Sequence, residues 1–172
     1  MSGELGDRAA ELLARACAME AEAAERYGEL ADQLELHGNG EVASLFRRLA
    51  SVERRHAEAI AQDLERRGIT RMPQKALAAP GQEGLETASS ESLHYLMTPY
   101  HALKIALENE EHALAYFTEL AGRDGPEDFR RLADEFAEEE REHVKLVREW
   151  LARVPQPAED WSSDPDEPRS VD

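Results

Sequence analysis

The chain has 172 residues, 41% of them hydrophobic, which is enough for one compact domain with a core. Its formal net charge of −17 would repel nucleic-acid phosphates and anionic lipids, so nucleic-acid and membrane partners are excluded and small cations are favoured. The sequence contains no bilayer-spanning stretch and no apolar signal-peptide region, which predicts a cytoplasmic protein.

The first half of the chain predicts a helical hairpin. Apolar and alanine residues recur at spacings of three and four from Asp7 to Leu36, as on one face of a helix. The residues Gly38-Asn39-Gly40 end this helix, and a second apolar stripe runs from Val42 to Ile60, with Gly68 as the expected C-terminal cap. Residues 69–97 are rich in proline, glycine, serine and threonine, and they predict a connection long enough to cross a bundle.

The second half predicts another hairpin. Thr98-Pro99 is typical of an N-cap followed by proline at the first helical position, and the helix should continue to Ala121. Asp124-Gly125-Pro126 marks a turn before a fourth amphipathic helix that reaches Trp150. We therefore expect an all-α four-helix bundle over residues 1–154 and a disordered acidic tail over residues 155–172.

The second and fourth helices repeat each other. The series Val42, Leu45, Leu49, Glu53 and His56 aligns at one constant offset with Phe129, Leu132, Phe136, Glu140 and His143. This alignment predicts an internal duplication of a helical hairpin.

Acidic residues and histidines occur at positions that should face the interior. Each Glu-x-x-His pair places its two side chains on one helix face, because residues three apart lie one above the other. Glu20 lies on the apolar stripe of the first helix, and on the third helix Glu111 lies between Leu107 and Leu114, three residues after Glu108. The expected inward-facing set is Glu20, Glu53, His56, Glu108, Glu111, Glu140 and His143.

So many buried carboxylates predict bound metal, because an isolated buried ion costs several kcal/mol even after relaxation. Carboxylate oxygens with one imidazole per ion favour iron or manganese, although affinity order alone favours copper or zinc. The alternative is a solvated acidic face, since a chain with 37 acidic residues matches Glu-x-x-His easily. Glu91 to His94 is interpreted as such an incidental match.

Several neighbouring residues have simpler interpretations. Tyr27 and Tyr116 are either core residues or hydrogen-bond donors to ligating carboxylates. Cys17 and His101 are interpreted as packing residues, and a single cysteine excludes an internal disulfide or a Cys-x-x-Cys metal site. The remaining acids near the motifs are expected to be surface charges: Glu22, Glu25, Glu110, Glu138, Glu139 and Glu142.

The order of motifs resembles the rubrerythrin family of the ferritin-like superfamily. The chain shows Glu-x6-Tyr, Glu-x-x-His, Glu-x-x-Glu followed by tyrosine, and Glu-x-x-His, over roughly residues 8–152. The resemblance implies a ferritin-like bundle with a long connection between the second and third helices, and two non-haem irons. By the same resemblance, Glu53 and Glu140 bridge the irons and Glu20 binds the first. Glu108 with His143 would bind the second iron, and Glu111 would exchange with His56 on the first.

The resemblance also implies an activity, the reduction of hydrogen peroxide to water. A rubredoxin domain is missing, as in the shorter erythrin or sulerythrin type, so a separate electron-donor protein is expected. We also expect a homodimer, with or without helices exchanged between the two chains. The alternatives are reaction with dioxygen as a ferroxidase, an iron-storage role without turnover, or an oxygenase acting on a large substrate, and manganese or zinc could replace iron.

Overall fold

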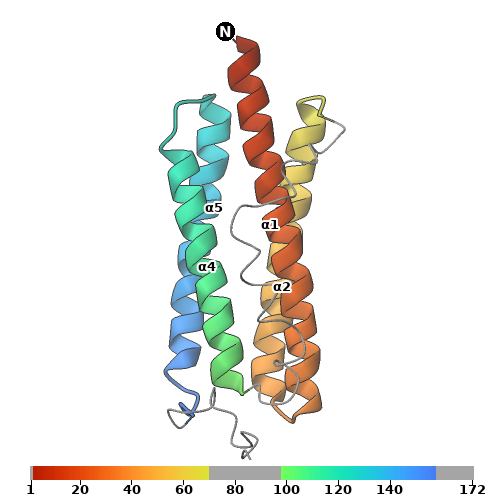
Figure 1. Ribbon diagram of the computed structural model, residues 1–172, viewed down its shortest axis with the longest axis vertical. Coiled ribbons are helices and arrows are strands. Elements are labelled where there is room, and N and C mark those ends of the chain that lie inside the picture. Colours follow the sequence, from red (N-terminus) through yellow and green to blue (C-terminus); the bar gives the residue numbers. More distant parts are fainter. Residues whose placement is uncertain (1, 70–97, 158–172) are drawn as a thin grey trace, which may run out of the picture.

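Two helical hairpins lie side by side in the computed structural model, which describes residues 2–69 and 98–157 (Figure 1). The first hairpin consists of α1 (Ser2–Leu36) and α2 (Gly40–Arg66), and the second of α4 (Pro99–Ala121) and α5 (Glu127–Leu151). The described part of the chain contains no other helix and no strand, which confirms the all-α prediction. The predicted central connection and most of the predicted acidic tail fall outside these residues.

The helix ends follow from the local sequence. Gly38 and Gly68 have φ values of 78° and 75°, a left-handed conformation that glycine adopts at little cost after a helix. Thr98 accepts a hydrogen bond from the backbone N–H of His101 through its side chain, and Pro99 is the first residue of α4. The predicted N-cap is therefore confirmed.

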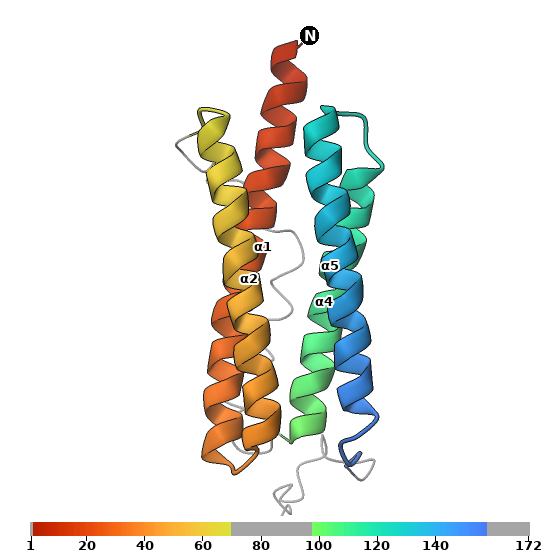
Figure 2. The ribbon, with the colours of Figure 1, turned by 180° about the vertical axis from the view of Figure 1, so that it is seen from behind.

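The hairpins are joined in the manner of a ferritin-like bundle. The last residues of α2 and the first residues of α4 lie at opposite ends of the molecule (Figures 1 and 2). As a result α2 and α4 run in the same direction, whereas the helices of each hairpin are antiparallel. One long crossover between otherwise antiparallel helices distinguishes this topology from an up-down-up-down bundle.

Two apolar clusters fill the bundle, and a polar layer separates them. One cluster packs Tyr27, Phe46 and Leu103 near the turn between α1 and α2. The other packs Ile60, Phe117 and other apolar side chains toward the opposite end. Among the described helices, none has the length and low charge needed to cross a membrane. The functional question therefore concerns the polar layer between the two clusters.

Candidate metal centre

Four glutamates and two histidines from all four helices meet in this polar layer. Each glutamate is at most 2% exposed, and His56 is 5% exposed. The carboxylate–histidine cluster consists of Glu20 on α1, Glu53 and His56 on α2, Glu110 on α4, and Glu140 and His143 on α5. The fold thus places acidic side chains at the positions where apolar side chains would normally fill the core.

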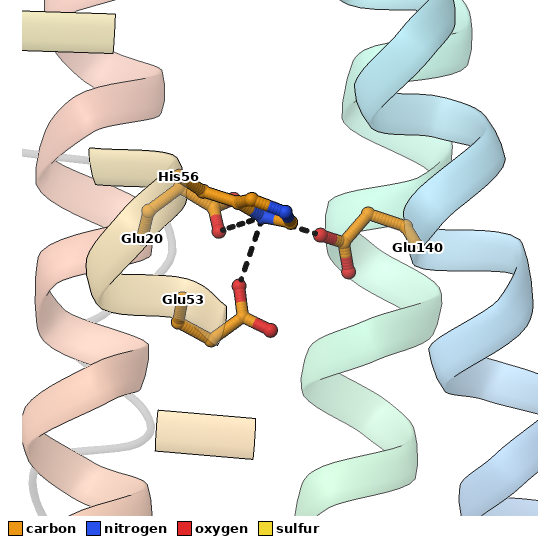
Figure 3. Close-up of side chains that lie close together, drawn as sticks. All are labelled: Glu20, Glu53, His56 and Glu140. Carbon is orange, nitrogen blue, oxygen red and sulfur yellow. Dashed lines mark hydrogen bonds and ion pairs between the residues drawn. The ribbon is translucent and has the colours of Figure 1, made fainter. Parts of the chain in front are cut away.

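One half of the cluster forms around His56 (Figure 3). The Nδ1 atom of His56 lies 3.3 Å from Glu20 Oε2, 3.5 Å from Glu53 Oε2 and 3.4 Å from Glu140 Oε1. Four ligand atoms, one from each of these residues, lie within 4.8 Å of one another. Three carboxylates and one imidazole could therefore bind a single ion here.

The other half forms around His143 and uses two of the same carboxylates. The Nδ1 atom of His143 lies 3.0 Å from Glu110 Oε2, 3.1 Å from Glu53 Oε1 and 3.6 Å from Glu140 Oε2. Glu53 and Glu140 each direct one oxygen to His56 and the other to His143. This is the arrangement that a carboxylate needs to bridge two metal ions.

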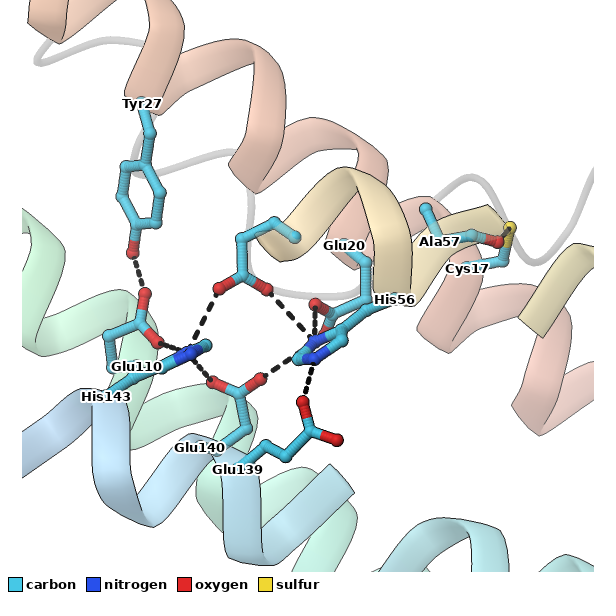
Figure 4. Close-up of polar contacts among 10 residues, drawn as sticks. Cys17, Glu20, Tyr27, His56, Ala57, Glu110, Glu139, Glu140 and His143 are labelled. Carbon is cyan, nitrogen blue, oxygen red and sulfur yellow. Dashed lines mark hydrogen bonds and ion pairs between the residues drawn. The ribbon is translucent and has the colours of Figure 1, made fainter. Parts of the chain in front are cut away.

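Hydrogen bonding and aromatic packing fix the side chains around the cluster (Figure 4). The Tyr27 hydroxyl donates a short hydrogen bond to Glu110 Oε1 from across the bundle. The two imidazole rings lie nearly parallel, at 15° with centroids 5.9 Å apart, and the Phe136 ring packs 5.0 Å from His56. Aromatic cover and close helix packing shield the carboxylates from water.

Electrostatic interactions divide the four carboxylates into two kinds. Burial raises the pKa of Glu110 to about 8, and it also raises the pKa of Glu20 well above its ordinary value. Burial acts in the same direction on Glu53, but hydrogen bonds from Glu20 and His143 outweigh it and lower the pKa of Glu53. Glu140 behaves alike, because hydrogen bonds with both histidines overcome burial and lower its pKa. The two shared glutamates therefore remain ionised most readily.

The remaining titratable groups respond to the same negative charge. Burial disfavours protonated His143, but hydrogen bonds to Glu110 and Glu140 dominate and raise its pKa to about 12. The pKa of His56 is raised in the same way, against its burial, by Glu140, Glu20 and Glu53. Burial, together with the charge of Glu110, raises the pKa of the Tyr27 phenol, so that this hydroxyl remains a hydrogen-bond donor. In the absence of metal, protonated histidines balance the carboxylates.

Three oxygens of the cluster lack a well-directed hydrogen bond and fit divalent cations. Both oxygens of Glu140 and Oε1 of Glu53 are buried and accept no well-aligned hydrogen bond among the described residues, although each lies within 3.6 Å of a histidine nitrogen. Buried acceptors normally find partners, so these three atoms call for a cation. Four carboxylates would neutralise two divalent ions if both imidazoles were neutral, and a donor set rich in hard oxygen atoms suits iron or manganese.

Five of the seven predicted inward-facing residues come together, but the prediction for α4 was wrong. Glu108 and Glu111 are exposed, and Glu111 pairs with Arg148 at 2.6 Å on the surface. Each helical residue is rotated by about 100° from the one before it, so Glu111 cannot share the inward direction of Glu110. The buried residue is Glu110, which the sequence analysis assigned to the surface.

An ungapped comparison of the first helix in each hairpin would have identified Glu110. The buried series Leu13, Ala16, Glu20, Tyr27 and Leu30 aligns residue for residue with Leu103, Ala106, Glu110, Phe117 and Leu120. The larger Leu107 and Leu114 indicate the wrong buried face for α4, because both are only half-buried and lie at the margin of the face that packs inward. Small alanines such as Ala106 lie at the centre of the buried face of α4, where the helices approach closely.

The two tyrosines have different roles. Tyr27 contacts a cluster carboxylate, as one of its two interpretations predicted. Tyr116 does not, because its hydroxyl donates to the backbone carbonyl of Leu12 at 2.9 Å. Tyr116 follows Glu110 by six residues, which turns it away from the cluster by about 120°. Cys17 is half-buried and packs beside the cluster, with its thiol 3.4 Å from the carbonyl oxygen of Ala57.

Comparison with known proteins agrees with this geometry. The rubrerythrin family model matches residues 11–151 of the chain, a range that contains the whole carboxylate–histidine cluster. The crystal structure of an uncharacterized conserved protein from Magnetospirillum magnetotacticum MS-1 is similar, with a TM-score of 0.70 and 38% sequence identity over 87% of this chain and 97% of the other. A search of curated proteins found no match.

Proposed function

The chain belongs to the rubrerythrin family, and we propose that it is a non-haem diiron oxidoreductase that reduces hydrogen peroxide to water. The observation that carries this proposal is the division of the oxygens of Glu53 and Glu140 between two histidines. A shared pair of carboxylates with one further glutamate and one histidine for each ion is the donor set of two-metal sites in this bundle topology.

Two ferrous ions held by the cluster would supply the two electrons that cleave the O–O bond of hydrogen peroxide, with two protons taken up to give two water molecules. Glu20 and Glu110 would each bind one ion, and Glu53 and Glu140 would contact both. The Tyr27 hydroxyl keeps its proton and orients Glu110, while the Phe136 ring shields His56 from water. Manganese or zinc could occupy the same donors.

We propose that the electrons come from a separate protein. The chain has one cysteine, so it cannot form a four-thiolate iron site of its own. A separate electron-donor protein is therefore part of the proposal, and a homodimer, with or without exchanged helices, is the expected assembly. The net charge of −17 favours a donor whose docking surface is basic.

A ferroxidase or iron-storage role is the second candidate, and the position of Glu111 favours it. Exchange of Glu111 with His56 on one iron was the feature expected to distinguish a peroxidase from a general ferritin-like site. Glu111 instead pairs with Arg148 on the surface, so the cluster presents four glutamates rather than five. That smaller set is shared by two-metal proteins with several activities.

Anaerobic loading with ferrous iron, followed by rapid mixing, separates the two candidates. A peroxidase should bind two irons per chain, and one equivalent of hydrogen peroxide should oxidise both faster than the same concentration of dioxygen does. Faster oxidation by dioxygen, with further iron accumulating beyond two per chain, would favour the ferroxidase. Solution mass distinguishes a dimer from a storage shell, and the Glu53→Ala variant gives the background rate.

A further inference from the structure

The two halves of the cluster differ in what lies behind each histidine. His56 uses Nδ1 toward the cluster, and its other ring nitrogen, Nε2, lies 2.5 Å from Oε2 of Glu139 (Figure 4). Glu139 precedes Glu140 on α5, and its side chain is 54% exposed, whereas that of His56 is only 6% exposed. A partly solvated carboxylate thus contacts the outer edge of a buried imidazole.

His143 has no such contact from the equivalent position. When Glu53-x-x-His56 is aligned with Glu140-x-x-His143, the residue that corresponds to Glu139 is Val52. Valine offers no hydrogen-bond acceptor. Among the described residues, the contacts of His143 with carboxylates all use Nδ1. The internal repeat therefore differs at this position: Glu139 offers an acceptor to the outer nitrogen of His56, whereas Val52 offers none to His143.

We propose that Glu139 is a positioning residue that fixes the orientation and tautomer of His56, and that it makes the Glu20–His56 metal position bind more tightly than the Glu110–His143 position. This inference rests on the proposed function, because it requires the cluster to hold metal. A proton on Nε2 donated to Glu139 leaves the Nδ1 lone pair free for an ion. A carboxylate acceptor on the outer N–H also makes the imidazole a stronger donor.

The contact of Tyr27 with Glu110 increases the expected difference in metal affinity between the two positions. A hydroxyl that donates to Glu110 withdraws electron density from a carboxylate of the Glu110–His143 position. The residue of α4 that aligns with Tyr27 in the repeat is Phe117, which has no hydroxyl to donate to Glu20. The Glu20–His56 position thus has an imidazole that Glu139 makes a stronger donor, and its carboxylate is not weakened by a tyrosine. The Glu110–His143 position has an imidazole without such a contact and a carboxylate that the Tyr27 hydroxyl weakens.

Calorimetric titration of metal-free protein with Mn²⁺ tests the inference. The parent protein should show two unequal binding steps. Glu139→Ala should weaken the tighter step by about 10-fold, the lower end of the effect of residues that orient metal ligands, because water can reach this side chain. The weaker step should be unchanged. Glu139→Gln should restore part of the loss, since its amide oxygen still accepts a hydrogen bond.

Glu142→Ala is the matched control, because it removes the same charge from an exposed position on the same helix. A second measurement reports on the hydrogen bond itself. In Zn²⁺-loaded protein with ¹⁵N-labelled histidine, the Nε2 proton of His56 should resonate at lower field than that of His143. Glu139→Ala should abolish this difference, and Glu139→Gln should retain some of it.

Two results would overturn the inference in distinguishable ways. If the parent protein binds two Mn²⁺ ions and Glu139→Ala behaves as Glu142→Ala does, Glu139 has no positioning role and the proposed metal site stands. If the parent protein binds no Mn²⁺ and no Fe²⁺, the metal site fails, and the inference about Glu139 fails with it.

Discussion

The Tyr27 hydroxyl on α1 donates a hydrogen bond to Glu110 on α4 and thereby ties one hairpin to the other inside the core. The tyrosine is fully buried, and Glu110 is only 2% exposed. Glu110 also lies 3.0 Å from His143, so the hydrogen bond fixes a carboxylate that already contacts the cluster. The contact therefore serves both the packing of the two hairpins and the proposed metal site.

Replacing Tyr27 by phenylalanine should affect stability and metal binding together. Loss of the hydroxyl leaves a buried carboxylate with one partner fewer, which should destabilise the metal-free protein by about 1–3 kcal/mol. Mn²⁺ should bind more tightly at the Glu110–His143 position, because the hydroxyl no longer withdraws electron density from Glu110. Urea unfolding and calorimetry measure the two effects.

Tyr116→Phe is the control for this experiment. Its hydroxyl donates to the carbonyl of Leu12 and contacts no cluster carboxylate. The variant should lose about 1 kcal/mol of unfolding free energy and keep the metal affinity of the parent protein. Equal metal affinities for Tyr27→Phe and the parent would show that the Tyr27 hydroxyl matters for packing alone.

The register of α4 can be tested with neighbouring glutamates. Glu110→Ala should reduce tightly bound metal from two ions to one, because it removes the only buried carboxylate that α4 contributes among the described residues. Glu111→Ala should leave both ions bound and change stability by less than about 1 kcal/mol, since it breaks only an exposed pair with Arg148. Elemental analysis of the purified variants measures the metal content of each. Two ions in Glu110→Ala and one in Glu111→Ala would show that Glu111, and not Glu110, faces the cluster.

The inward-facing residues of α2 and α5 could be predicted from the sequence, whereas that of α4 could not, for a physical reason. On α2 and α5, glutamate and histidine three residues apart determine the inward face by themselves, so the directions of Glu53 and His143 were predicted correctly. On α4 three glutamates lie within four positions, and only neighbouring residues could distinguish them. The large leucines lie at the margin of that face, whereas the small Ala106 marks its centre.

The contact between His56 and Glu139 was beyond sequence analysis. It joins α2 to α5 through the outer edge of an imidazole, and no periodicity predicts which exposed acid of a neighbouring helix reaches that edge. The fold was predictable because each helix has its own apolar stripe and end signals. A contact between two helices depends instead on their separation and rotation, which the sequence pattern leaves open.

The shared carboxylates should be the most sensitive positions for metal content. Glu53 and Glu140 each direct oxygens to both histidines, so Glu53→Ala or Glu140→Ala should lose both ions. Glu20→Ala removes a group that belongs to one half only, and it should weaken mainly one ion. Two tightly bound metals in the double variant lacking Glu53 and Glu140 would rule out bridging.

The metal-free protein should lose stability as the pH rises from 6 to 8. The folded-state pKa of Glu110 is about 8, against an ordinary value of 4.5, so the folded protein keeps a proton that the unfolded chain has already lost. His143 keeps its proton in the folded state up to a pKa of about 12, against 6.5 ordinarily. Because the folded state binds more protons throughout this window, the free energy of unfolding falls with rising pH.

Bound metal should reverse this trend, because ligands must be deprotonated before they bind an ion and affinity therefore grows with pH. The Tm of metal-free protein should fall from pH 6 to pH 8 by on the order of 5 °C, while the gap between Mn²⁺-loaded and metal-free protein widens. Thermal melts followed by circular dichroism measure both quantities. Glu110→Gln, which cannot ionise, should reduce the pH dependence of the metal-free Tm without abolishing it, because His143 still contributes, and Glu111→Gln should leave it unchanged. A metal-free Tm that rises over this range would mean that the folded protein binds fewer protons than the unfolded chain, so that neither Glu110 nor the two histidines keep raised pKa values.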